Sequence, residues 1–596
     1  MTSTLERPAE AVPRPDLAAG PGQPGARSSR IGGLDGLRAI AVAAVVVYHL
    51  GMGWLPGGFL GVDLFFVISG FLITTLLLAE IERSGRIRYG RFYLRRAKRL
   101  LPALFLMLLG ALSLAAAIAR DAALPTLRDV PGALLYISNW WALGTDQSYF
   151  EIIGRGSLLG HLWSLAVEEQ FYLVWPLLLG GIALVSRGRL RLGVLITAGI
   201  AALISTAWMA TFAVQHEVPL GTDPTRVYFG TDTHAMSVLA GAALAAVWNV
   251  SRFRADVVPG ARRVLLGAGV AGLALSALLM LTITEYTSWL YRGGFLVTSL
   301  VFALVVASAT HPASPLGPAL DNPVMRWVGA RSYGIYLFHW PIFLVTRPGL
   351  DVGQGWLVNA ARVTLVLVVA DLSYRYVEVP IRRGTFGTWW LDRRVLVAAL
   401  AATCALAAAL ATAPRAAEVA VSRALGPTAD VVDGAPVDGQ EAVAAPAVQT
   451  AWYGDSVMLW TVDALREAFP GARVDAGINR APTNIMSRVR ADAPMSGVVV
   501  MHLGNAGPVP GRELSDTLTA LADAERVVLV NSNATFPYVA QANATLAAVA
   551  GDFPNVTLVD WQGLSSGRSE WFTDGLHLTD EGQAAFVTAV REAMAA

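Results

Sequence analysis

The sequence of 596 residues contains little charge. Asp, Glu, Lys and Arg make up 15% of the residues, whereas hydrophobic residues make up 54%. A soluble protein usually carries about 25% charged residues. The deficit, together with many long apolar runs, therefore indicates a polytopic membrane protein. The net charge is only +1, so overall charge gives no argument for nucleic-acid binding.

Cysteine is almost absent as well. The one cysteine, Cys404, lies in an apolar run, which excludes an intramolecular disulfide framework in any compartment. Residues 1–30 are rich in Pro, Ala and Gly and lack apolar periodicity, so we expect a disordered tail there. This tail lacks the apolar region and cleavage site of a signal peptide. We expect no metal and no tightly bound cofactor.

Long apolar runs are candidate membrane spans, and the sequence contains eleven of them. They lie at about 36–53, 60–80, 100–119, 167–185, 192–214, 232–249, 264–283, 293–309, 327–346, 356–377 and 395–413. The shorter aromatic stretch 129–144 is expected to be interfacial or re-entrant rather than spanning.

Positive charge predicts the orientation of these spans. Arginine and lysine gather in segments that join alternate spans, at 81–99, 186–191, 251–263 and 375–394. By the positive-inside rule these segments and the N-terminus lie in the cytoplasm. Eleven spans then place the C-terminus outside.

The first apolar run, LDGLRAIAVAAVVVYH at 34–49, carries Asp35 and Arg38 at one end. His49 follows Arg38 by eleven residues, which places the two side chains roughly 16 Å apart along a helix axis. Ionisable groups within a span are costly, so each is a candidate functional residue. The alternative is an arginine that reaches the headgroups and a histidine that only packs.

A second basic stretch, RFYLRRAKRLLPA at 91–103, enters the third span from the predicted cytoplasmic side. Its arginines Arg95, Arg96 and Arg99 include a pair three positions apart, which shares a helix face and suits phosphate binding. The alternative is a plain topology signal.

Polar side chains also recur in HLWSLAVEEQFYLVWP at 161–176. His161, Ser164 and Glu168 are spaced to share one helix face. A carboxylate in such an apolar run is expected to face a polar cavity rather than lipid; the alternative is a position in the headgroup layer. Asp63, in GVDLFFVISGFL at 61–72, has the same two interpretations.

The character of the chain changes after Pro414. Residues 414–448 are rich in Ala, Val, Pro and Asp without clear periodicity, and are interpreted as a tether. From about residue 449 predicted strands and helices alternate. Such alternation is typical of a parallel sheet covered by helices on both faces.

This C-terminal part carries two short motifs for nucleophilic chemistry. GDS at 454–456 follows a predicted strand and precedes a helix, so Ser456 is expected at a helix N-terminus, where backbone amides favour an oxyanion. DGLH at 574–577 places Asp574 and His577 three residues apart just before the last helix.

The four membrane motifs quoted above occur in an order that resembles the acyltransferase type 3 family of integral membrane proteins, over about residues 31–385. The resemblance implies that Arg38, Arg95, Arg96 and Arg99 bind the phosphates of an acyl-coenzyme A. It implies that His49 is general base or acyl carrier. Glu168 would orient His49 or contact the acceptor.

Two later stretches extend this resemblance. RVYFGTDTHAM at 226–236 is similar to a family motif, but His234 stands where Arg is more usual, which weakens any role at that position. WVGARSYGIYLFHWPIF at 327–343 also fits the family pattern, and His339 within it is interpreted as structural.

The C-terminal motifs resemble the SGNH (GDSL-like) esterase and acyltransferase superfamily. The implied roles are nucleophile for Ser456, general base for His577, orienting residue for Asp574 and backbone oxyanion donor for Gly477. The third block departs from the family, because Ala506 stands at the oxyanion asparagine and Asn505 lies one residue early. Either Asn505 serves or one donor is missing, and a degenerate carbohydrate-binding domain is the alternative.

These inferences combine into one expected organisation. A cytoplasmic tail (1–30) precedes a membrane acyltransferase domain (31–385), an additional span (386–413), a linker (414–448) and an extracytoplasmic SGNH-like domain (449–596). We expect a bacterial inner-membrane O-acyltransferase that moves an acyl group, expected to be acetyl, from cytoplasmic acyl-coenzyme A to a cell-surface glycan or glycolipid. The alternative is a transporter of an acylated lipid or sugar with an external binding module.

Overall fold

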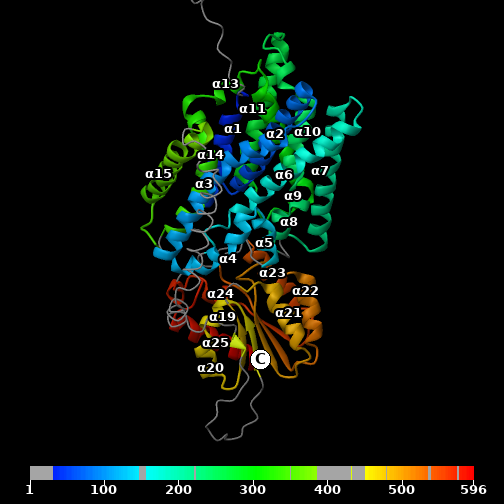
Figure 1. Cartoon of the computed structure of the whole chain (residues 1–596). Helices are drawn as coiled ribbons and strands as arrows, with labels where there is room; N and C mark the ends of the chain where they lie inside the picture. The colour runs from blue at the N-terminus through cyan, green and yellow to red at the C-terminus, as the bar shows by residue number, and fades with distance from the viewer. Residues whose placement is uncertain are drawn as a thin grey trace, which may run out of the picture.

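A computed structural model defines the fold and consists of a helical part and an α/β part (Figure 1). It describes residues 31–145, 156–219, 223–348, 351–384, 431–432, 450–477, 480–534, 538–573 and 576–595. The expected tail 1–30, the eleventh apolar run at 395–413 and Asp574 lie outside the described residues.

The helical part follows the apolar runs of the sequence, and each of the first ten runs forms or contributes to a helix. The longer helices are α1 (Leu34–His49), α2 (Gly61–Ser84), α3 (Tyr89–Ala117), α6 (Leu162–Val185), α7 (Leu190–Gln215), α10 (Met236–Val247), α11 (Pro259–Thr282), α12 (Phe295–Thr310), α14 (Pro323–Val345) and α15 (Trp356–Ser373). The other helices of this part are α4 (Ala123–Leu134), α5 (Ser138–Gly144), α8 (Thr225–Phe229), α9 (Thr231–His234), α13 (Leu316–Leu320) and α16 (Val379–Arg383).

Length and composition decide which helices can cross a bilayer. Within the described ranges, six are long and apolar enough: Gly58–Ser84, Tyr89–Ala117, Leu190–Gln215, Pro259–Thr282, Leu290–Thr310 and Trp356–Arg383. Helices α1 and α10 coincide with predicted spans but have only 16 and 12 residues, fewer than the roughly 20 that a full span needs. The stretch 129–144, expected to be interfacial or re-entrant, forms the end of α4 and all of α5, which are too short to span.

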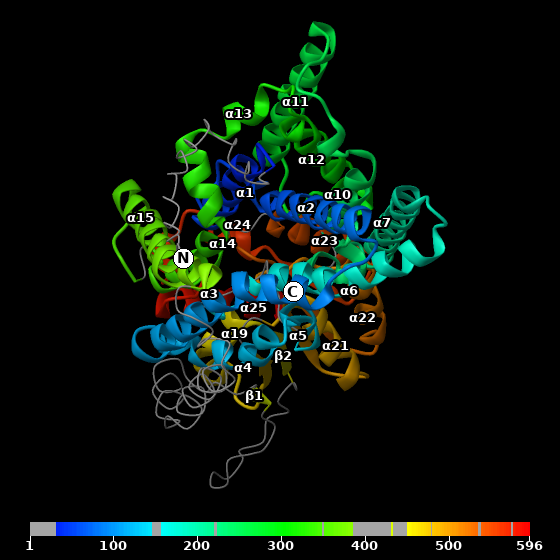
Figure 2. The same ribbon diagram turned by 45° about the horizontal axis from the view of Figure 1, so that its top comes forward.

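Burial separates central from peripheral helices. In α7, α11 and α15, only 22–28% of the most apolar stretch of the helix is buried inside the protein, whereas in α2 and α12 the buried share is 61–67%. Figure 2 shows α7, α11 and α15 at the edge of the bundle and α1 and α2 inside it. The exposed apolar side chains of the peripheral helices suit a lipid environment.

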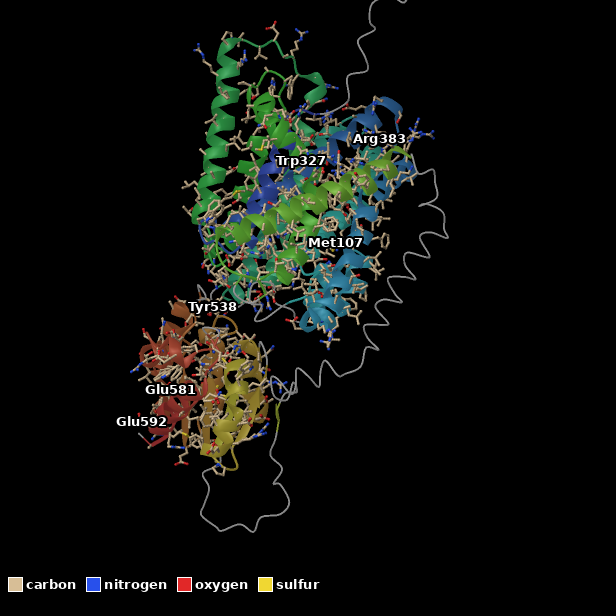
Figure 3. All side chains as sticks on the ribbon, turned by 90° about the vertical axis from the view of Figure 1, so that its left-hand side faces the viewer. Met107, Trp327, Arg383, Tyr538, Glu581 and Glu592 are labelled. Carbon is tan, nitrogen blue, oxygen red and sulfur yellow. The ribbon has the colours of Figure 1, made fainter. Side chains whose placement is uncertain are left out.

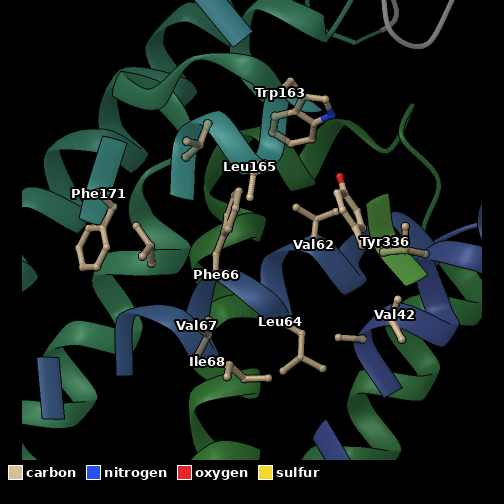
Figure 4. Close-up of a cluster of buried hydrophobic side chains, with 14 of the residues drawn as sticks. Val42, Val62, Leu64, Phe66, Val67, Ile68, Trp163, Leu165, Phe171 and Tyr336 are labelled. Atoms are coloured by element: carbon tan, nitrogen blue, oxygen red, sulfur yellow. The ribbon is translucent and has the colours of Figure 1, made fainter. Parts of the chain in front are cut away.

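Close helix packing brings α1 against α14. A Cβ atom on Gly329 of α14 would lie 1.9 Å from the carbonyl oxygen of Asp35 in α1, so only glycine permits this approach. Buried rings fill the neighbouring space: Phe66 of α2 packs edge-on against Trp163 of α6, close to Tyr336 of α14 (Figure 4). The close approach at Gly329 thus sets the start of α1 directly against α14.

The α/β part contains a six-stranded sheet in the order β1-β3-β2-β4-β5-β6. The strands are β1 (Val431–Val432), β2 (Thr450–Gly454), β3 (Arg473–Ala476), β4 (Val498–His502), β5 (Arg526–Val530) and β6 (Val556–Val559). All neighbours pair in parallel except β1, which is antiparallel to β3. The predicted parallel sheet is thus confirmed, although β1 comes from the stretch interpreted as a tether.

Helices cover both faces of this sheet. They are α19 (Ser456–Trp460), α20 (Val462–Ala468), α21 (Pro482–Asp492), α22 (Gly511–Ala520), α23 (Val539–Ala550), α24 (Trp561–Ser565) and α25 (Asp580–Ala595). Two separate apolar cores result, one under α19, α20 and α25 and one under α21, α22 and α23. Helix α21 was not expected from the sequence, although its buried residues Pro482, Ile485, Met486 and Val489 follow the spacing of one helix face.

The two parts meet at a small contact. The ring of Tyr286, from the loop after α11, lies 5.4 Å from the ring of Tyr538, and both are buried together with Val539. Figure 3 shows Tyr538 at the end of the α/β part that faces the helical part.

Candidate active site

A pair of histidines links α1 to α14. His49 is the last residue of α1, and its Nδ1 lies 3.0 Å from Nε2 of His339. His339 is fully buried, and its Nδ1 lies 2.5 Å from the carbonyl oxygen of Tyr336. The ring of His161 lies 5.6 Å from that of His339. Of these three histidines, the sequence indicated a catalytic role for His49 alone, and the interpretation of His339 as structural missed the direct contact between them.

The local sequence explains how His161 joins this cluster. Pro341 lies within α14 and has no N–H for the carbonyl of Leu337 four residues earlier. Nε2 of His161 lies 3.1 Å from that carbonyl oxygen. The proline therefore creates an acceptor inside the bundle, which the histidine satisfies.

Glu168 has other neighbours than the sequence suggested. Its carboxylate accepts hydrogen bonds from the hydroxyls of Ser69 and Tyr172. The Nδ1 of His49 faces His339, so the role predicted for Glu168, to orient His49 or to contact the acceptor, stays a prediction. Glu168 lines a small inner cavity with Arg38, Arg96, Arg99, Ser164 and Tyr336.

Two larger basic cavities adjoin this inner one. The first, of about 470 Å³, is lined by apolar side chains together with Glu80, Arg83, Arg88, Arg91, Arg95, Arg96 and Arg99. The second, of about 610 Å³, is lined by polar and aromatic residues that include Asp35, Arg38, Arg99, Arg326, Trp327, Tyr374 and Arg382. All four arginines predicted to bind the donor therefore line cavity walls, and Arg99 lines all three.

Some of these arginines are held by neighbours. The guanidinium of Arg96 lies 3.8 Å from the centre of the Tyr172 ring, a cation–π contact. Arg38 lies 3.6 Å from Asp35 on the same helix. Tyr172 thus touches both Arg96 and Glu168, which connects the basic side of the cavity to its carboxylate.

His234 and Asp63 form a separate, fully buried pair. Nε2 of His234 lies 2.8 Å from Oδ1 of Asp63, and its Nδ1 lies 2.7 Å from the carbonyl oxygen of Tyr228. Ser237 donates a further hydrogen bond to Asp63. The sequence assigned no firm role to position 234. In the structure, His234 is a hydrogen-bonding partner for the buried carboxyl group of Asp63.

In the α/β part, Ser456 and His577 are adjacent. Ser456 opens α19 directly after β2, and its Oγ lies 3.0 Å from Nε2 of His577. The side chain of Asp455 caps the helix by accepting from the N–H of Val457 at 3.0 Å. The ring of His577 stacks on Trp460 at 4.6 Å. The two residues are thus placed as a nucleophile–base pair requires, whereas Asp574 lies outside the described residues.

The predicted oxyanion donors are hydrogen-bonded within the protein. The N–H of Gly477 donates to the carbonyl of Gly454 at 3.3 Å. Nδ2 of Asn505 lies 3.3 Å from the ring of His502, and the backbone carbonyl of Asn505 accepts from the Tyr538 hydroxyl at 2.8 Å. Both oxyanion roles therefore stay predictions, and so does the alternative of a missing donor at Ala506.

Comparison with known proteins agrees with these features. The model of the acyltransferase 3 family, described as an acyltransferase domain, matches residues 31–375. The chain belongs to this family.

Several known proteins are similar to this chain, two of them over nearly its whole length. Peptidoglycan O-acetyltransferase OatA of Listeria monocytogenes is 35% identical, with 94% of this chain and 97% of the relative covered. YrhL of Bacillus subtilis, provisionally named a peptidoglycan O-acetyltransferase, is 32% identical over 95% of this chain and 98% of the relative. The C-terminal catalytic domain of OatA from Streptococcus pneumoniae, solved with a methylsulfonyl adduct, is 22% identical over 25% of this chain and 93% of that one, with a TM-score of 0.23.

Family membership settles the type of enzyme. The chain is an O-acyltransferase, as the sequence predicted. A membrane acyltransferase part followed by an α/β part is therefore its organisation, and the alternative of a transporter loses its basis. The acyl-coenzyme A donor and the roles of the individual site residues stay predictions.

Proposed function

We propose that this acyltransferase moves an acetyl group from cytoplasmic acetyl-coenzyme A to hydroxyl groups of peptidoglycan outside the cell. The observation that carries the proposal is the presence of two nucleophile or base pairs, His49–His339 and Ser456–His577, in two parts of one chain. The names of the relatives from Listeria and Bacillus support an acetyl group and a peptidoglycan acceptor.

The donor would bind on the arginine-lined side. Phosphates of coenzyme A suit guanidinium groups, which bind them with two parallel hydrogen bonds. Arg38, Arg95, Arg96 and Arg99 supply this chemistry around the two basic cavities. The pantetheine arm would then enter the inner cavity between Glu168 and Tyr336.

The first transfer would occur at His49. The ring nitrogen attacks the thioester carbonyl, a C–N bond forms, the C–S bond breaks and coenzyme A leaves as the thiolate. The helical geometry supports this direction of travel, because His49 lies roughly 16 Å further along α1 than Arg38.

The second transfer would use the α/β part. His577 takes the hydroxyl proton of Ser456 as the oxygen attacks the acyl carbonyl carried by His49. The C–O bond forms, the C–N bond breaks and His49 leaves as the neutral imidazole, which gives an acetyl-serine. A glycan hydroxyl then attacks this ester with His577 again as base, and Ser456 recovers its proton. The buried Ser456–His577 contact of 3.0 Å supports these roles.

Reconstitution of the full chain tests the proposal. Proteoliposomes supplied with acetyl-coenzyme A and peptidoglycan fragments on opposite sides should release free thiol and acetylate the fragments, as measured with a thiol reagent and by mass spectrometry. His49→Ala should abolish both signals. Release of no thiol by the parent protein would contradict an acyl-coenzyme A donor, and acetylation without peptidoglycan specificity would contradict the acceptor.

A further inference from the structure

The backbone of α14 determines where His339 carries its proton. A carbonyl oxygen can only accept a hydrogen bond. Nδ1 of His339 lies 2.5 Å from the carbonyl oxygen of Tyr336, so Nδ1 carries the hydrogen. His339 is fully buried in the bundle, where a charged imidazolium is costly. A neutral ring with a hydrogen on Nδ1 has its lone pair on Nε2.

This lone pair determines the state of His49 in turn. Nε2 of His339 lies 3.0 Å from Nδ1 of His49, and a hydrogen bond between them needs one donor. Because Nε2 of His339 can only accept, Nδ1 of His49 carries the hydrogen. The lone pair of His49 is then on its Nε2. His49 is half-buried, so this nitrogen belongs to the more accessible ring of the pair.

We propose that His339 is a positioning residue that fixes the tautomer of His49 and thereby presents Nε2 of His49 as the reacting nitrogen. The proposal rests on the proposed acyl transfer at His49. The task resembles that of the carboxylate in a serine–histidine triad, which holds a histidine tautomer and orientation. Here the acceptor is a neutral ring backed by a carbonyl, which avoids the cost of a buried carboxylate.

The surroundings of the pair support a fixed orientation. The His49 and His339 rings are stacked with centres 5.1 Å apart, and Trp340 meets His49 edge-on at 4.9 Å. His161 anchors the carbonyl of Leu337 within the same turn of α14. When positive charge develops on His49 during acylation, its hydrogen bond to His339 strengthens, because a charged donor bonds more strongly than a neutral one.

Two substitutions of His339 separate positioning from packing. In His339→Gln the side-chain oxygen can still accept from Nδ1 of His49, whereas His339→Leu fills the space without an acceptor. We expect kcat for acetyl-coenzyme A turnover to fall by about a hundredfold or more in the leucine variant and to stay within about tenfold of the parent in the glutamine variant. KM should change little in both. The same two substitutions, to glutamine and to leucine, at His216 serve as the control, because His216 is an exposed residue stacked on Phe212.

A spectroscopic measurement tests the tautomer directly. The full chain labelled with ¹⁵N-histidine in nanodiscs should show, by difference from His49→Gln, a protonated Nδ1 and an unprotonated Nε2 for His49. A protonated Nε2 in the parent, or equal activity of the two His339 variants, would overturn the proposal. If the parent turns over no acetyl-coenzyme A, the proposed function fails, while the ¹⁵N signals still decide the tautomer.

Discussion

The four arginines that are predicted to bind the donor differ in how many of the three cavities they line. Arg99 lines all three cavities, Arg38 and Arg96 line two, and Arg95 lines one. If phosphates and the pantetheine arm pass through these cavities in turn, Arg99 contacts the donor at the junction. Single arginines should therefore contribute unequally to donor affinity.

Removal of Arg99 should weaken donor binding most. We expect Arg99→Ala to raise the Kd for acetyl-coenzyme A about tenfold to a hundredfold, the range for one lost hydrogen bond to a charged group. Isothermal titration of the purified protein measures this. The salt dependence should be shallower than in the parent. Arg263→Ala, an exposed position on α11 outside these cavities, should bind normally, and equal affinity of Arg99→Ala would remove Arg99 from the donor site.

The serine of the α/β part should be essential for the last step only. Ser456→Ala is expected to lower peptidoglycan acetylation by about a thousandfold or more while donor binding in the membrane part stays intact. Ala506→Asn should raise the rate if the oxyanion site lacks a donor, by up to about 3–4 kcal/mol of transition-state stabilisation. Both are measured by mass spectrometry of muropeptides. Undiminished acetylation by Ser456→Ala would mean that the membrane part transfers directly.

At the scale of elements, the approach of α1 to α14 decides whether the histidine pair can form. Gly329 permits this approach, since its absent Cβ would collide with the backbone of Asp35. His49 and His339 lie further along the same two helices. A change at Gly329 therefore acts on the pair through helix position rather than through direct contact.

An alanine at Gly329 should separate these helices. We expect Gly329→Ala to destabilise the protein by about 1–3 kcal/mol, as overpacking does, and to lower thiol release from acetyl-coenzyme A. Thermal unfolding in detergent gives the first quantity and a thiol assay the second. Gly199→Ala on the peripheral helix α7, where a Cβ would meet no atom within 4 Å, is the matched control. A normal melting temperature for Gly329→Ala would contradict the close packing.

At the scale of the whole molecule, the proposed acyl transfer needs the donor site of the helical part and Ser456 of the α/β part at opposite ends of one transfer path. The cavities lined by arginine belong to the helical part, and the contact between Tyr286 and Tyr538 joins this part to the α/β part. Tyr538 also holds the carbonyl of Asn505. The contact therefore touches the loop that carries the predicted oxyanion donor.

The predicted orientation is testable without any assay of activity. A reporter that is active only outside the cytoplasm, fused after Ala596, should be active, because eleven spans from a cytoplasmic N-terminus leave the C-terminus outside. The same reporter inserted in the 251–263 segment should be silent. Activity only from a cytoplasmic reporter at the C-terminus would contradict the predicted topology.

The sequence by itself determined those features of this protein that depend on composition and on local residue patterns. Long apolar runs predicted the helices, because a bilayer leaves the backbone no other partner than itself. Alternating strands and helices predicted the parallel sheet, and short motifs singled out Ser456 and His577, which the fold brings within 3.0 Å across 121 residues. Four arginines were predicted to bind the donor, and all line cavities.

Only the tertiary structure decided which polar groups meet. His49 and His339 are 290 residues apart, and no local spacing shows that Gly329 lets their helices approach. The partners of Glu168 come from α2 and its own helix rather than from His49. The acceptor for His161 arises because Pro341 frees a carbonyl in another helix. A sequence states which groups are costly to bury, whereas the packing of helices determines how each of them is satisfied.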